Sequence, residues 1–257
     1  MKRIGLILIC IVTVLCMACS KKANVDYGDN IVISLEGCEI VLNKISAGNF
    51  LMGSYEGIGD EDELPVREVT ITEDFYMGVF EITQAQWEAV MGNNPSTFKG
   101  KELPVETISW KDANAFCEKL SELSGYDVSL PTEAQWEYAC RAGTTTKWFF
   151  GDEETAYSTY GETDVDAKTY PVGSFEANPN GLYDMYGNVM EWCLDYYSAE
   201  YLADDLTDPT GPKKGEARIS RGGGWGASPD SCRSGYRNAC GEQDATDGIG
   251  FRIVINP

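Results

Sequence analysis

Cysteine is the residue type in this chain with the most direct chemistry. The chain contains nine cysteines and no histidine. Without imidazole, the sequence excludes Ser-His-Asp and Cys-His nucleophiles and every metal site that depends on histidine. Catalytic or metal-binding chemistry would therefore have to come from thiolates and carboxylates.

Six of the cysteines follow Cys19, at positions 38, 117, 140, 193, 232 and 240. In an exported protein they could form disulfides in several pairings, and their spacing does not choose among them. Cys117 and Cys140 lie on predicted helix faces, where a buried free thiol is an equal alternative.

Carboxylates are the other candidates for acid, base or metal-binding roles. Glu133, Glu137 and Glu191 each lie near a tryptophan in "TEAQWEYAC" or "MEWC". A catalytic role is one interpretation. We favour a structural role, either on a helix surface or in a buried ion pair.

Three helices are expected to position these residues. Thr83, Ser109 and Thr132 are N-cap residues, followed three residues later by Gln86 and Asp112 in the first two cases. Glu133 in the first turn of the third helix suits the helix dipole. The tryptophans are expected in the core, at positions 87, 110, 136 and 192.

Strands are expected on both sides of the helices. "IVISLEGCEIVLNKI" alternates apolar residues and predicts a hairpin, and "GNFLMGS", "REVTI" and "FYMGVFEIT" predict further strands. "NVMEWCLDYY", "ARISRGGGW" and "GIGFRIVI" predict one strand each, separated by long loops. We therefore expect a single α+β domain over residues 31–257, with much irregular structure.

The N-terminus has the pattern of a bacterial lipoprotein. Lys2 and Arg3 precede the apolar run "IGLILICIVTVLCMA", which predicts a signal peptide over residues 1–18. A single membrane anchor helix is the alternative. "LCMAC" resembles a lipobox with Cys19 as the lipidated residue, and residues 19–30 would form a polar tether. The expected location is the cell envelope, on the outer-membrane surface, with a lipid anchor as the membrane contact.

The charge of the chain limits its partners. With a formal net charge of −21, the surface repels nucleic acid and anionic lipid headgroups. We therefore expect no nucleic-acid partner.

The order of motifs resembles the formylglycine-generating enzyme family, also called the sulfatase-modifying-factor domain. The resemblance rests on "GNFLMGS", "FYMGVFEITQAQWEAVMG", "LPVETISWKDANAFC", "LPTEAQWEYACRAGT", "NGLYDMYGNVMEWC", "RGGGW" and "GFR". It implies a C-type-lectin-like fold over nearly the whole mature chain.

The enzymes of that family use two cysteines, five residues apart, which bind copper(I). Counted from "RGG", the second falls on Cys232 and the first on Ala227, while Cys240 has the wrong spacing. One thiolate cannot supply the linear two-thiolate site. The resemblance also implies a structural calcium near Asn188 and Glu191, which stays an open alternative; no cofactor is otherwise required.

A second resemblance concerns the stretch from Arg221 to Arg252. Its layout is similar to that of variable proteins diversified by retroelements, in which mutable positions arise from codons ending in C. The framework would comprise Arg221, Gly222, Gly223, Trp225, Cys232, Arg233, Ser234, Arg237, Gly250, Phe251 and Arg252. The mutable positions would be Gly226, Ala227, Ser228, Asp230, Ser231, Tyr236, Asn238, Ala239, Cys240, Gly241, Asp244, Thr246, Asp247 and Gly248.

These observations predict a non-catalytic, surface-displayed lipoprotein. Its mutable positions, together with Trp225, would bind a variable ligand such as a protein or a host or bacterial surface molecule. Small polar residues around aromatic side chains are typical of evolved paratopes, with Tyr236 as the expected energetic centre. The alternatives are a copper-dependent oxidase acting on a sulfatase cysteine, and a structural envelope lipoprotein.

Overall fold

The computed structural model describes residues 28–161, 168–201 and 206–257. The predicted signal peptide, Cys19 and most of the tether lie outside these residues. Among the described helices, none has the length and apolar character that a membrane crossing requires.

The predicted N-terminal hairpin is confirmed and forms the edge of a sheet. Strands β1 (Asn30–Leu35) and β2 (Cys38–Ile45) pair antiparallel from Asn30 opposite Asn43 to Leu35 opposite Cys38. Gly37 in the turn has a φ of 79°, a value that glycine adopts without strain. The five-stranded sheet continues in the order β1-β2-β5-β11-β6. Its other strands are β5 (Phe75–Gly78), β11 (Val254–Ile255) and β6 (Val128–Ser129).

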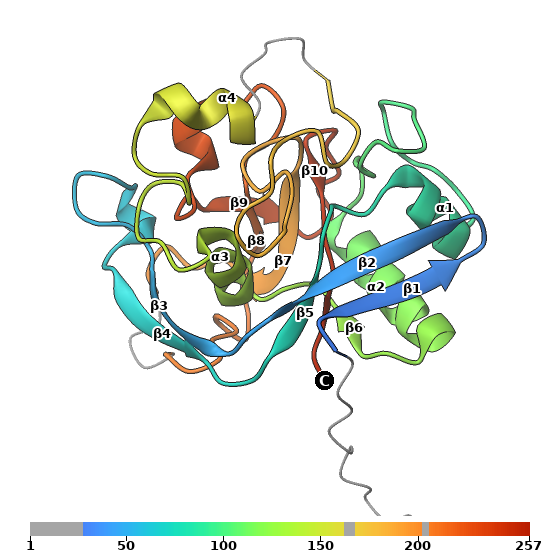
Figure 1. The fold of residues 1–257 in the computed structure, drawn as a ribbon, viewed down its shortest axis with the longest axis horizontal. Coiled ribbons are helices and arrows are strands. Elements are labelled where there is room, and N and C mark those ends of the chain that lie inside the picture. Colours follow the sequence, from blue (N-terminus) through green and yellow to red (C-terminus); the bar gives the residue numbers. More distant parts are fainter. Residues whose placement is uncertain (1–27, 162–167, 202–205) are drawn as a thin grey trace, which may run out of the picture.

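A second sheet carries the C-terminal stretch. It has the order β10-β7-β8-β9, with β7 (Met190–Tyr196), β8 (Ala217–Arg221), β9 (Asn238–Gly241) and β10 (Ile249–Gly250). A separate ribbon pairs β3 (Gly48–Met52) with β4 (Arg67–Ile71). Figure 1 shows β1, β2 and the first two long helices on one side of this arrangement and β3 and β4 on the other.

The three predicted helices begin at the predicted caps. Helices α1 (Gln84–Met91), α2 (Trp110–Ser124) and α3 (Glu133–Arg141) each have a complete capping box, with Thr83, Ser109 and Thr132 as N-caps. For α3 the residue that completes the box is Gln135. A short helix, α4 (Tyr157–Tyr160), lies in a segment that we expected to be irregular.

"GIGFRIVI" was expected to form one strand, and that prediction is wrong. The segment gives β10 in one sheet and β11 in the other, with residues 251–253 between them. The buried guanidinium of Arg252 bonds the carbonyls of Gly78 and Tyr183. These bonds hold the chain between the sheets, so strand pairing changes partner there.

The hydrophobic core forms two clusters. One surrounds α1 and α2 and contains Trp87, Trp110 and Trp192; the other surrounds α3 and contains Trp136. All four tryptophans are buried, as predicted. The chain thus has the expected α+β class, with a core on both sides of the second sheet's strands.

Candidate functional site

Burial alternates sharply along the stretch from Arg221 to Arg252. The predicted framework residues other than Trp225 are all buried. Every predicted mutable position is at least partly exposed. The stretch therefore has an inner set of side chains that is fixed by packing and an outer set that faces solvent.

The beginning of this stretch is a tight turn over Cys232. Gly223 has a φ of 74°, and a side chain there would collide with Cys232. A short 3₁₀ helix at Pro229–Cys232 then brings the chain back toward β8. Residues Asn238–Gly241 form β9, paired antiparallel with β8, although this part of the stretch has no strand period. Pairing with β8 imposes this strand on a segment with little strand propensity of its own.

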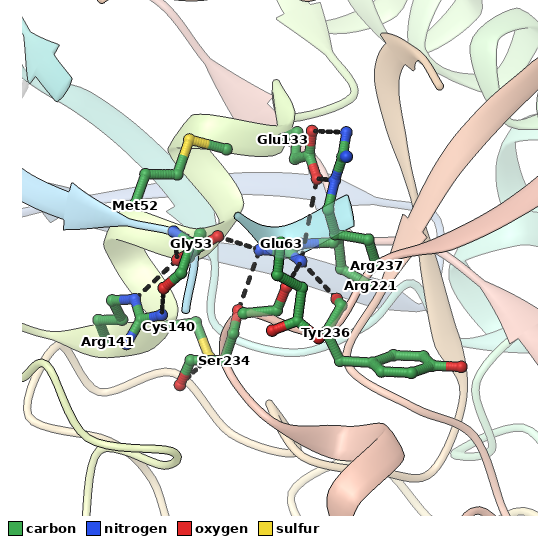
Figure 2. Close-up of polar contacts among 12 residues, drawn as sticks. Met52, Gly53, Glu63, Glu133, Cys140, Arg141, Arg221, Ser234, Tyr236 and Arg237 are labelled. Atoms are coloured by element: carbon green, nitrogen blue, oxygen red, sulfur yellow. Dashed lines mark hydrogen bonds and ion pairs between the residues drawn. The ribbon is translucent and has the colours of Figure 1, made fainter. Parts of the chain in front are cut away.

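Arg221 is the centre of the buried network under the stretch (Figure 2). It is fully buried, and its guanidinium donates to the carbonyls of Ser234 (Nη2 to O, 2.9 Å), Gly235 (Nη1 to O, 2.7 Å) and Tyr236. It also bonds the Glu137 carboxylate. One arginine thus fixes three consecutive backbone carbonyls.

Two arginines within the stretch bind carboxylates that lie outside it. Arg233 Nη1 bonds Glu63 Oε2 at 2.7 Å. Arg237 forms a two-point pair with Glu133, Nε to Oε1 at 2.7 Å and Nη2 to Oε2 at 3.0 Å. Arg237 Nη1 also donates to the carbonyls of Asp62 and Ser198. Sequence reasoning assigned no partners to these arginines, because the carboxylates lie more than one hundred residues away.

The ion pairs set the ionisation of these carboxylates. Burial alone would raise the pKa of Glu63, but hydrogen bonds from Arg233 and Ser54 outweigh it and lower that pKa. Burial likewise opposes ionisation of Glu133, and the charges of Arg237 and Arg221 more than compensate, so its pKa is lowered. Both groups remain charged, and their oxygens point at guanidinium groups.

Glu133, Glu137 and Glu191 are therefore all in buried ion pairs, one of the two structural roles that the sequence favoured. Glu137 bonds Arg221 and, through Oε1, Arg141 Nε at 2.8 Å. Glu191 bonds Arg252 at 2.6 and 2.7 Å and accepts from the Trp136 indole at 2.7 Å.

The implied calcium does not fit Asn188 and Glu191 as they are arranged. Both Glu191 oxygens bond the Arg252 guanidinium. Asn188 Oδ1 accepts from the Tyr170 amide at 2.9 Å, and its Nδ2 donates to Glu81 Oε1 at 3.0 Å. Neither side chain has an oxygen free for a cation.

The implied copper site does not fit either. Cys232 is buried, and burial raises the pKa of its thiol to about 12. Ala227, at the position where the resemblance places the first cysteine, packs against the same core cluster as Cys232. The six cysteines at positions 38, 117, 140, 193, 232 and 240 are free thiols.

The outer side chains near Tyr236 form one group. The Tyr236 ring lies 5.8 Å from the Arg233 guanidinium and points away from the buried network in Figure 2. Ser228 and Ser231 hydroxyls lie 3.2 Å apart, and Asp230, 75% exposed, pairs with Lys147 at 3.5 Å.

Trp225 has different neighbours from Tyr236. Its ring packs edge-on against Phe98, and its indole donates to the Asp247 carbonyl at 2.8 Å. Other predicted mutable positions lie in or beside β9. There the Asn238 side-chain amide donates to Cys240 Sγ, and the Asp244 carboxylate accepts from the backbone amide of Gly241. Trp225 and Tyr236 thus contact different residues of the stretch and of the rest of the chain.

A separate cavity of about 730 Å³ lies between the β1–β2 turn and α1. Its lining includes Cys38, Phe80 and Glu102 and none of the predicted site residues. This cavity is thus separate from the candidate surface.

Comparisons with known proteins give the family context. The family model described as "Sulfatase-modifying factor enzyme 1-like domain" matches residues 39–257. The chain is 29% identical to "Chaperone protein LppX" of Paenibacillus barcinonensis, over 92% of this chain and 93% of that protein. It is 33% identical to the formylglycine-generating enzyme of Streptomyces coelicolor, over 66% of this chain and 58% of the enzyme.

The structure is similar to that of Treponema denticola variable protein 1. The TM-score is 0.82 at 28% identity, covering 89% of this chain and 99% of the other. This similarity confirms the C-type-lectin-like α+β fold expected from the motifs.

Proposed function

We propose that this chain, which belongs to the sulfatase-modifying factor enzyme 1-like family, is a non-catalytic, surface-displayed lipoprotein. It would bind a variable ligand through the outer side chains between Trp225 and Gly248. It would be exported, anchored through a lipid on Cys19 and located at the outer-membrane surface. The proposal requires no cofactor.

The observation that carries this proposal is the separation of inner and outer side chains. Arg221, Arg233 and Arg237 are held by buried ion pairs, while every predicted mutable position between them is at least partly exposed. A surface that tolerates replacement needs such an arrangement, because exposed substitutions away from special contacts change stability little. The similarity to a protein named as variable supports the same conclusion.

The direction of the chain also supports display. In Figure 1 the start of β1 and the C-terminus lie at the lower end of the molecule, whereas the orange-to-red segment leading to β10 lies in its upper half. A tether leaving at the lower end would leave the candidate surface accessible. A protein partner is the ligand class that we favour, since the relative matched along nearly its whole length is named a chaperone.

The coding DNA provides the decisive test. We expect a C at the third base of the codons for the outer positions, and a near-copy of this segment beside a reverse-transcriptase gene. Absence of both features would remove the diversification part of the proposal.

Tyr236→Ala tests the placement of the binding surface. We expect loss of ligand binding with a melting temperature close to that of the wild type, because the ring lies outside the buried network. Ligand binding that survives this change would place the surface elsewhere. Tyr126→Ala, at a half-buried tyrosine beside α2, is the matched control and should leave binding intact.

An oxidase of the formylglycine-generating type is the second candidate, and identity to the enzyme from Streptomyces coelicolor favours it. It predicts copper(I) binding by the purified protein and oxygen consumption with a cysteine peptide. A structural envelope lipoprotein would instead co-purify in a stable envelope complex.

A further inference from the structure

The loop between β3 and β4 exposes two large apolar side chains. Tyr55 is 49% exposed and Ile58 is 43% exposed. The Ile58 amide donates to the Tyr55 carbonyl at 3.0 Å, so a turn keeps the two residues close together. A partner that covers these side chains removes apolar surface from water, which favours binding, and no existing packing is lost.

This loop is joined directly to the stretch that contains Tyr236. Arg233, which binds Glu63, also lies 3.7 Å from Asp60 (Nη2 to Oδ2). A side chain at Gly235 would collide with Ser54 and Glu63, which shows how closely the two segments pack. The Tyr236 pKa is raised by burial and by the Asp60 and Asp62 carboxylates, in keeping with their proximity.

The exposed charges of the loop itself are negative. Glu56, Asp60 and Glu61 are exposed there. The one arginine that joins the segments, Arg233, is 5% exposed and paired with Glu63. A partner that covers Tyr55 and Ile58 therefore meets a negative field.

The acidic residues of this loop are not arranged as a free cation site. Asp60, Asp62 and Glu63 lie close together, but Glu63 and Asp60 face Arg233, and Asp62 accepts from the Tyr197 hydroxyl at 2.9 Å. These three carboxylates thus contact the protein's own groups.

We propose that residues 55–62 form a constant arm of the binding surface, which selects partner proteins that present lysine or arginine next to an apolar side chain. This inference rests on the proposed function. The apolar pair would supply affinity common to all variants, and the carboxylates would set orientation and association rate. The outer residues of 226–248 would then distinguish among basic partners.

The test uses the purified full chain and a fluorescent hexapeptide that alternates arginine and tryptophan, followed by anisotropy. Tyr55→Ser/Ile58→Ser should weaken binding about tenfold or more, equivalent to about 1.4 kcal/mol. Val32→Ser/Leu123→Ser is the matched control, because those side chains are 50% and 60% exposed elsewhere. It should bind as the wild type does.

A charge series completes the test. Glu61→Lys should weaken binding most at low salt, whereas Glu122→Lys, an exposed change on α2, should have little effect. A glutamate–tryptophan peptide should not bind. Three results would each overturn the proposal. They are failure of the basic peptide to bind the wild type, equal loss of binding in both double-serine variants, and binding of the wild type to anionic lipid vesicles in preference to the peptide.

The outcomes separate this inference from the proposed function. If Tyr236→Ala weakens binding and the loop variants do not, the loop inference fails and the proposed surface stands. If the loop variants weaken binding and Tyr236→Ala does not, the loop binds basic partners and the surface around Tyr236 is misplaced.

Discussion

Arg221 shows how much one buried side chain can organise. Its guanidinium holds three consecutive carbonyls and one carboxylate in a region without solvent. Its Nε is buried without a hydrogen-bond partner among the described residues, so the charge is compensated through the two Nη atoms. Removal of a buried charge leaves its partner uncompensated. The conformation of Ser234–Tyr236 thus depends on a residue from β8.

Arg221→Met should lower the free energy of unfolding by about 3–5 kcal/mol, because Glu137 Oε2 and the three carbonyls lose the donor that Arg221 supplies. Urea denaturation measures this change. Lys214→Met, at an exposed position, should change stability by less than about 0.5 kcal/mol. A small effect at Arg221 would mean that the network contributes little to stability.

Acid should weaken the attachment of Arg237 to Glu133. The pKa of Glu133 is lowered in the folded protein, whereas an unfolded glutamate titrates near about 4.3. The folded state therefore binds fewer protons, so its extra stability is present above about pH 4.3 and is lost as the pH falls through the folded pKa. Unfolding curves of Glu133→Gln should show a flatter acid dependence than those of the wild type; an unchanged slope would contradict this assignment.

At the scale of elements, the chain's local signals predict the helices well. Ser109 and Asp112 form the predicted capping box of α2. The residues at helical spacing, Trp110, Ala113, Phe116, Cys117 and Leu120, are buried on one face. Capping and a 3.6-residue period are local properties, so the sequence alone reveals them. The division of "GIGFRIVI" and the formation of β9 depend on distant partners, and no local pattern reveals those. The same holds for the pairs Arg233–Glu63 and Arg237–Glu133.

The end of α3 offers a test of local backbone strain. Ala142 has a φ of 47° in the left-handed region, where glycine is usual. Ala142→Gly should stabilise the protein by roughly 0.5–1 kcal/mol, since relief of the left-handed strain exceeds the entropy cost of glycine. A lower melting temperature for this variant would mean that the Ala142 methyl group contributes packing.

At the scale of the whole molecule, the two sheets and the arginine network give the candidate surface a rigid base. The stretch is attached at β8, at Arg233, at Arg237 and at β10, so its backbone is fixed at four places between residues 217 and 250. Outer side chains can then change without a change in these attachments.

A combined variant tests this independence. Ser228→Asn, Asp230→Asn, Ala239→Asn and Thr246→Asn together should shift the melting temperature by only about 2–4 °C, a change of about 1 kcal/mol for a chain of this size. Cys232→Asn, one buried substitution in the same stretch, should destabilise far more, because it places an amide among apolar groups. A large effect of the combined variant would show that the outer positions support the fold.

The turn at Gly223 over Cys232 has a consequence for the proposed function. A side chain at Gly223 would collide with Cys232, and Cys232 and Ala227 both pack in the core cluster around α3. Under the non-catalytic role that we propose, no substrate constrains the residues above this sulfur. Replacements there can then change what the surface recognises while the packing beneath them stays the same.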